Sequence, residues 1–264
     1  MAVCTDSSSL LSGAAADALG VALIPVGITL DGEPVDTRTT LVDDFYARLR
    51  GGAVATTSQP NAAEFVEAYE RAAVAGAEAV VSIHLDARVS GTVSAAGVAA
   101  VAAPVPVTVV DTGTVSYGVG ICVRAAATVV AAGGSATEAA VAAIALGSRL
   151  ENAFVAPRTS GGRIPATSDW TLWTFANGAA TPASESSGIE EAVDRISARV
   201  LLGDRPVSVA VGHAAREVEA AADELAHQLL RSSLVLAVER YRVDPAVGAH
   251  TGPDSFGAFW WPEM

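Results

Sequence analysis

The stretch AVVSIHLDARVSGTVSAAGVAAVAAPVPVTVV, residues 79–110, decides the fold of this chain. Short apolar runs at 79–85 and 105–110 are typical of buried strands. Between them, a loop leads to an alanine-rich segment that predicts a helix over 91–103. A strand, a helix and a second strand in this order indicate a parallel β-α-β unit whose sheet is covered by helices on both faces.

The same alternation of strands and helices continues on both sides of this unit. The elements expected before it are a strand at 2–5, a helix at 10–19, a strand at 21–30, a helix at 41–50 and a helix capped by Asn61. The elements expected after it are helices at 115–132 and 137–150 and a short strand at 153–156.

A change of composition after residue 150 indicates a second domain. Residues 157–187 are rich in serine, threonine, glycine, alanine and proline. The alternation then resumes with a helix at 189–200, a strand at 207–212, a helix at 217–230 and strands at 234–241 and 256–261. We therefore expect an α/β protein with two domains. The N-terminal domain, 1–152, has a mostly parallel sheet with helices on both faces, and a smaller α/β domain spans 153–264.

The charge and the cysteine content exclude several classes of function. The net charge of −13 and the isoelectric point near 4.6 disfavour nucleic acid, whose phosphates an acidic surface repels. The chain contains no lysine, which excludes a phosphate-binding P-loop. The two cysteines, Cys4 and Cys122, match no metal-binding or redox spacing and indicate free thiols in a reducing cytoplasm.

Residues 89–110 carry no charge and are about long enough to cross a bilayer. Serine, glycine and proline interrupt this run, and its apolar residues are mostly alanine and valine, which are weakly lipophilic. The first six residues lack the basic start of a signal peptide. We therefore expect a cytoplasmic protein without a membrane span.

Three short polar clusters stand out in a chain that is 51% hydrophobic and 17% charged: TSQP at 57–60, SGT at 90–92 and HTGP at 250–253. Each cluster follows an apolar run or precedes a predicted helix. Small hydroxyls and backbone N–H groups at such junctions can bind a carboxylate or a phosphate. Taken alone, each cluster is more often explained by helix caps and turns, because these residues also satisfy nearby backbone groups.

Two single residues have both a functional and a structural interpretation. His250 has no nearby cysteine or second histidine, so a zinc site is not expected, and a lone histidine near a terminus is usually structural or exposed. Arg163 lies in a glycine-rich turn and is one of few cations in the chain. It either binds a ligand anion or forms a salt bridge with the acidic surface.

The order of the motifs is more specific than any one of them. In chain order they are TDSS at 5–8, TSQP at 57–60, SGTVSAA at 90–96, VVDT at 109–112, GGRI at 161–164 and HTGP at 250–253. This series resembles the DegV family of bacterial fatty-acid-binding proteins. The resemblance extends from Val3 to about Trp261, essentially the whole chain.

The resemblance implies a DegV-type fold that encloses a long-chain fatty acid between its two domains. The loops of the N-terminal domain would bind the carboxylate, through Thr57 and Ser90, with His250 close by, and the C-terminal domain would close the cleft. The complete ligand-binding set implied is Thr57, Ser58, Ser90, Gly91, Thr92, Arg163 and His250. In several members a separate kinase phosphorylates the bound carboxylate. The resemblance therefore implies a kinase partner, and no catalytic residue, metal or cofactor in this chain.

Two segments depart from the family pattern. A helix normally follows the GGRI turn, but here residues 165–169 lead quickly to Trp170. The usual basic loop before the next helix is replaced by SESSG at 184–188. These differences affect the expected lid of the acyl pocket and the kinase-docking surface more than the residues that bind the carboxylate.

Two alternatives to a carrier remain from the sequence. One is a hydrolase of acyl esters or thioesters, with Ser90 or Thr57 as nucleophile and His250 as base. Against it, Ser90 lacks the Gly-x-Ser-x-Gly surroundings of a nucleophile elbow, and the acid nearest to His250 in sequence is Asp254. The other is a degenerate family member that binds another carboxylate or acts as a sensor.

Overall fold

The computed structural model describes residues 1–37, 40–157 and 170–263. Backbone contacts divide the chain into two units, each made of two segments. The first unit contains Met1–Gly27 and Ser58–Arg149, and the second contains Ile28–Thr57 and Leu150–Met264. The domains 1–152 and 153–264 stay a prediction. The contacts group residues 28–57 with the C-terminal part of the chain.

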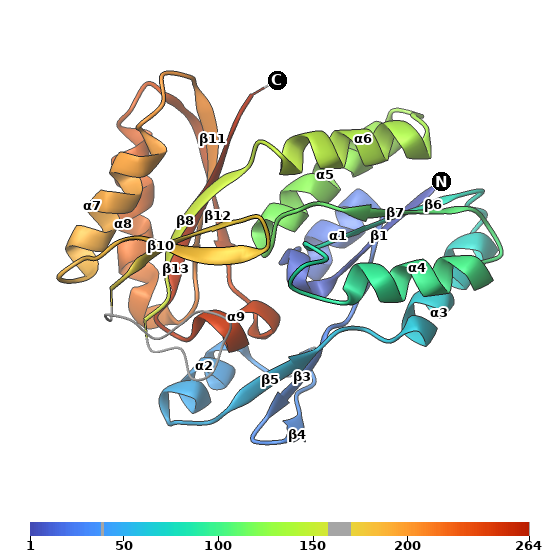
Figure 1. Cartoon of the computed structure of the whole chain (residues 1–264), viewed down its shortest axis with the longest axis horizontal. Helices are drawn as coiled ribbons and strands as arrows, with labels where there is room; N and C mark the ends of the chain where they lie inside the picture. Colours follow the sequence, from blue (N-terminus) through green and yellow to red (C-terminus); the bar gives the residue numbers. More distant parts are fainter. Residues whose placement is uncertain (38–39, 158–169, 264) are drawn as a thin grey trace. The chain divides into compact units, whose positions relative to one another are not determined.

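The first unit is built on a sheet of four parallel strands in the order β2-β1-β6-β7. The strands are β1 (Ala2–Asp6), β2 (Val21–Ile24), β6 (Val80–His84) and β7 (Val107–Asp111). The helices are α1 (Gly13–Leu19), α3 (Ala62–Val74), α4 (Thr92–Ala102), α5 (Tyr117–Ala131) and α6 (Ala136–Gly147). Helices α3 and α4 cover one face of the sheet, and α5 and α6 cover the other (Figure 1). The predicted α/β class and the parallel β-α-β unit are confirmed.

Local signals set several element boundaries. Asn61 forms the expected cap of α3: its side chain accepts from the N–H of Glu64, whose carboxylate accepts from the N–H of Asn61 at 2.7 Å. The predicted strand 21–30 is two strands, β2 and β3 (Gly27–Leu30), because Pro25 lies between them and has no N–H to pair. A 3-10 turn, Ser7–Ser9, follows β1.

The second unit contains a six-stranded mixed sheet in the order β10-β9-β8-β13-β11-β12. Its strands are β8 (Glu151–Val155), β9 (Leu172–Ala176), β10 (Ala179–Ser184), β11 (Val207–His213), β12 (Val235–Arg242) and β13 (Phe256–Pro262). β11 and β12 pair in parallel, and the other pairs are antiparallel. Helices α7 (Ile189–Val200) and α8 (Glu219–Leu230) pack beside this sheet over an apolar core (Figure 1).

Residues 28–57 and α9 complete the second unit. β3 lies between β4 (Glu33–Pro34) and β5 (Ala55–Ser58) in a small sheet, and α2 (Val42–Arg50) packs against α9 (Pro245–Thr251). A 3-10 turn, Arg216–Val218, precedes α8. The sequence analysis did not predict α9. Its signal is present in Asp244 and Pro245: the Asp244 side chain caps the helix, and proline occupies a first-turn position.

A row of buried hydrogen bonds joins β1 to β6 under helix α3. His84 Nδ1 donates to Asp6 Oδ2 at 2.7 Å, because a carboxylate can only accept. His84 Nε2 then accepts from the Ser82 hydroxyl, also at 2.7 Å. Ser82 in turn accepts from Tyr69 Oη at 2.9 Å and from the thiol of Cys4. Burial raises the pKa of Cys4 to about 12, so this cysteine acts as a neutral donor.

This Asp6–His84–Ser82 row has the connectivity of a hydrolytic triad, but its environment is that of a core. All three side chains have 0% exposure, so a substrate cannot reach the Ser82 hydroxyl. The row instead fixes the ends of two neighbouring strands. Asp6 also accepts from the N–H of Ser8 at 3.0 Å and from its hydroxyl, which holds the turn after β1.

We predict that His84→Ala lowers the free energy of unfolding by about 3–5 kcal/mol, because it removes one donor to the buried Asp6 carboxylate and leaves a cavity in the core. Urea denaturation measures this loss. Arg71→Ala is the matched control: it removes an exposed pair with Glu67 and should cost less than about 1 kcal/mol. Equal losses in the two variants would contradict the structural role of the row.

Candidate functional site

The loop after β6, at the carboxyl edge of the parallel sheet, holds the SGT cluster. The loop after β6 is tied to the loop after β7: the N–H of Asp86 donates to the carbonyl of Thr114 at 2.9 Å, and the N–H of Ala87 donates to Asp111 at 3.2 Å. The buried Asp86 carboxylate also accepts three hydrogen bonds from the Arg88 guanidinium, at 2.8, 3.2 and 2.7 Å. These bonds fix the path of the chain just before Ser90.

Ser90, Gly91 and Thr92 lie together at the start of helix α4. The Ser90 and Thr92 hydroxyl oxygens are 2.8 Å apart, and the Thr92 N–H donates to Ser90 at 3.3 Å. The first turn of α4 supplies N–H groups and the positive end of its helix dipole. The N-cap residue is Gly91, which makes no side-chain cap bond, and the hydroxyls and first-turn N–H groups form a set of neutral donors that suits an anion.

The cluster at 57–60 reaches the SGT cluster through Gln59. Gly91 packs so closely against the Gln59 side chain that a Cβ atom at position 91 would collide with it. Gly27 packs in the same way against the hydroxyl of Ser58. The first unit therefore brings Gln59 of the TSQP cluster next to the SGT cluster, and glycine at positions 27 and 91 permits the contacts.

Thr57 belongs to the second unit and contacts the third cluster. Its Oγ1 lies 2.9 Å from Nε2 of His250, on helix α9. The next residue, Ser58, is the first residue of the following segment of the first unit. The chain therefore passes from one unit to the other at a pair of hydroxyl residues, one of which is bonded to His250.

The turn after α9 is held by hydrogen bonds between nearby residues and contains a glycine with positive φ. Thr251 Oγ1 lies 2.8 Å from Ser255 Oγ, which donates to the carbonyl of Gly252 at 3.0 Å. Gly252 has φ of +78°, a conformation that favours glycine. The next acid, Asp254, forms an ion pair with Arg50. The carboxylate nearest to His250 in sequence is thus bonded to a guanidinium.

Some of the residues and segments singled out in the sequence cannot be compared with the structure. Arg163, the GGRI turn at 161–164 and the segment 165–169 that replaces the family helix all lie outside the described residues. Within the part of the chain that the structure describes, no group of three or more metal-ligating side chains is found. Among the same residues, every helix is too short or too polar to cross a membrane.

The residues that pack against the predicted site residues were not identified from the sequence. Tyr46 and Arg50 on α2 contact the segment around His250, as described below. Gln59 and Asp86 shape the loops beside Ser90. Only local signals are visible in a sequence, and of these contacts only Asp86–Arg88 is local enough to be noticed.

Comparisons with known proteins agree with this arrangement. A family model for uncharacterised proteins of the DegV family matches residues 1–263. The chain belongs to the DegV family. A DegV domain-containing protein from Streptomyces coelicolor is 34% identical over 273 residues, which cover 97% of this chain and 96% of the relative.

Solved structures of DegV proteins have the same fold. One of them, described as showing fatty acid binding by a DegV family protein from Thermus thermophilus, matches with a TM-score of 0.88 at 27% identity and covers 99% of both chains. DegV from Bacillus subtilis, described as a fatty acid binding protein, matches with a TM-score of 0.85 at 24% identity and also covers 99% of both chains. The predicted DegV-type fold is therefore confirmed.

Proposed function

We propose that this DegV protein binds a long-chain fatty acid and holds its carboxylate with the hydroxyls of Thr57 and Ser90. The observation that carries this proposal is the position of the 57–60 cluster. Thr57 is bonded to His250, while Gln59 packs on Gly91 beside Ser90, so residues two positions apart reach both other clusters. The Thermus thermophilus relative, whose fatty acid binding is described, supports the same ligand here.

The chemistry of these groups suits a carboxylate that must be released again. Hydroxyl and backbone N–H donors stabilise the charge by hydrogen bonds, and no lysine is present to form a stronger ion pair. The acyl chain would supply most of the affinity, at about 0.8 kcal/mol for each methylene that leaves water. In this proposal Ser58, Gly91, Thr92, His250 and Arg163 complete the ligand-binding set.

The proposal extends to the partner. A carrier that exposes a carboxylate end fits an acyl kinase, which would transfer a phosphoryl group to the carboxylate while the acyl chain stays bound. In this division of labour the carrier needs no metal, cofactor or catalytic residue of its own. Two buried free thiols, Cys4 and Cys122, support a reducing cytoplasm as the compartment.

One observation favours a second candidate function, hydrolysis of an acyl ester or thioester. The contact between Thr57 Oγ1 and His250 Nε2 has the length of a nucleophile–base pair. The carrier stays the leading proposal because the Thermus thermophilus relative is described as binding fatty acid, and the hydrolase is tested against it.

We predict that Thr57→Ala and Ser90→Ala each weaken palmitate binding by about 1–2 kcal/mol, roughly 5- to 30-fold, because each removes one donor to a charged acceptor. Titration calorimetry on delipidated protein measures the affinities. Thr181→Ala, which removes an exposed hydroxyl on β10, is the matched control and should bind like the wild type. If neither Thr57→Ala nor Ser90→Ala changes the affinity, the carboxylate is bound elsewhere.

We predict that the isolated protein releases no free acid from acyl-CoA or p-nitrophenyl esters. A carrier needs donors at the carboxylate, whereas a hydrolase needs an activated hydroxyl. Ester turnover that disappears in His250→Ala, and in either Thr57→Ala or Ser90→Ala, would overturn the carrier and establish the hydrolase. Turnover that survives all three substitutions would come from a contaminant and leave the carrier in place.

A further inference from the structure

Helix α9, which carries His250, is too short to set its own position. It has seven residues, Pro245–Thr251, and helices of this length are unstable alone in water. Its first turn is capped by Asp244, which accepts from the N–H groups of Ala246 and Val247 at 2.9 and 3.3 Å. The contacts that α9 makes with other elements of its unit must therefore decide where the His250 ring lies.

The first of these contacts comes from Tyr46 on α2. Tyr46 is 1% exposed, and its hydroxyl donates to the carbonyl of Val243, just before α9, at 2.9 Å. Its ring packs against Gly248 so closely that any Cβ atom at position 248 would collide with the ring and the hydroxyl. Tyr46 thus holds the beginning and the middle of α9.

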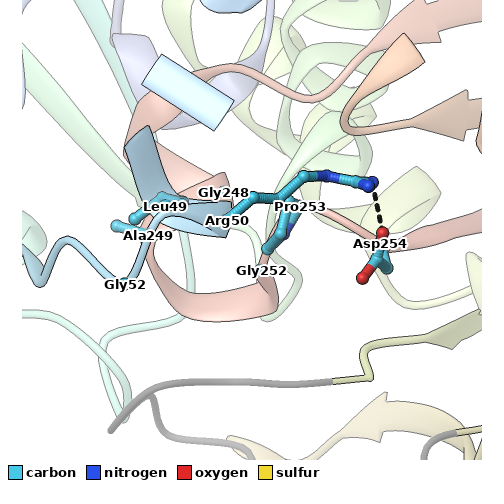
Figure 2. A pocket seen from close by; sticks show the side chains of 8 residues that line it. All are labelled: Leu49, Arg50, Gly52, Gly248, Ala249, Gly252, Pro253 and Asp254. Carbon is cyan, nitrogen blue, oxygen red and sulfur yellow. Dashed lines mark hydrogen bonds and ion pairs between the residues drawn. The ribbon is translucent and has the colours of Figure 1, made fainter. Parts of the chain in front are cut away.

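The second contact comes from Arg50, one helical turn further along α2. Its guanidinium pairs with Asp254, just after α9, and lies 3.5 Å from a carboxylate oxygen of Glu217. Arg50 lines a cavity of about 280 Å³. Figure 2 shows its side chain extended toward Asp254. Leu49, Gly52, Gly248, Ala249, Gly252 and Pro253 also line this cavity.

The charge of Arg50 matches its surroundings. The cavity is lined by the last turns of both α2 and α9, whose carbonyl ends carry partial negative charge. Asp254 is 8% exposed and adds a full negative charge. A guanidinium placed here is attracted by all three groups, so Arg50 serves as the cation of this cavity.

We propose that Tyr46 and Arg50 are positioning residues for His250. Spaced four residues apart on one face of α2, they fasten the chain before and after α9, and so hold His250 Nε2 within hydrogen-bond distance of Thr57. The same helix leads through Gly51 and Gly52 to β5, which ends next to Thr57. Helix α2 therefore helps to position both partners of the Thr57–His250 bond: it contacts the chain around His250 and leads to the strand that contains Thr57. The consequence for a bound carboxylate rests on the proposed function.

The direct test follows the His250 ring by ¹⁵N NMR of imidazole-labelled protein without ligand. The four histidine signals are assigned with His250→Gln. Tyr46→Phe keeps the ring and loses one hydrogen bond, and Arg50→Met keeps most of the side-chain length and loses the charge. Arg48→Met is the matched control, because Arg48 lies on the same helix and forms an exposed pair with Asp31 at 3.4 Å.

In Arg50→Met and Tyr46→Phe we expect the His250 Nε2 signal to move toward that of His227, a histidine on α8. The signal should recover in part in Arg50→Lys. It should stay unchanged in Arg48→Met. Palmitate affinity should fall about tenfold in Arg50→Met. This is the effect expected when a displaced His250 loses one charge-assisted contact with the palmitate carboxylate. Circular dichroism confirms folding, and Tyr46→Phe decides the matter if Arg50→Met fails to fold. An unchanged His250 signal in folded Tyr46→Phe and folded Arg50→Met would overturn the proposal. If the wild type binds no palmitate, the proposed function fails, while the His250 signal still decides the positioning role.

Discussion

The parallel pairing of β1, β6 and β7 is the constraint on which the rest of the structure depends. In a parallel sheet every strand ends at the same edge, so the loops after these three strands must meet there. The buried Asp6–His84–Ser82 row fixes two of the strand ends, and the bonds from Asp86 and Ala87 fix the loop that leads to Ser90. These hydrogen bonds therefore fix the edge of the sheet at which the donors for an anion lie.

The path of the chain supplies the remaining donors. After Gly27 the chain leaves the first unit, forms β3, α2 and β5 in the second unit, and returns at Ser58. The close packing of Gly27 against Ser58 brings the exit and the return together. The TSQP cluster therefore lies at the point of return, where Thr57 bonds to His250 in one unit and Gln59 packs on Gly91 in the other.

Much of this architecture could be predicted from the sequence because its signals are local. The apolar run at 79–85, the Asn61 capping box and the hairpin before α7, with Asn177 and Gly178 at positive φ in its turn, each depend on a few neighbouring residues. The order of the motifs also identified the family. The assignment of ligand-binding roles to Thr57, Ser90 and His250 stays a prediction.

What the sequence could not provide depends on contacts between distant residues. Helix α9 is too short for its apolar spacing to indicate a helix, and it is held by a bond from Tyr46 to Val243 across 197 residues of sequence. Arg50 and Asp254 are 204 residues apart, and nothing in the sequence indicates that they pair. The grouping of 28–57 with the C-terminal segment has the same origin, because α2 packs on α9.

The central claim, that this chain is a fatty-acid carrier, is tested most directly by measuring the mass of the lipid bound to the purified protein. Native mass spectrometry of the purified protein, followed by organic extraction and lipid mass spectrometry, reports any bound acid and its stoichiometry. The account predicts one fatty acid for each chain, released on denaturation and restored when palmitate is added to delipidated protein. A lipid-free chain that takes up no palmitate would contradict it.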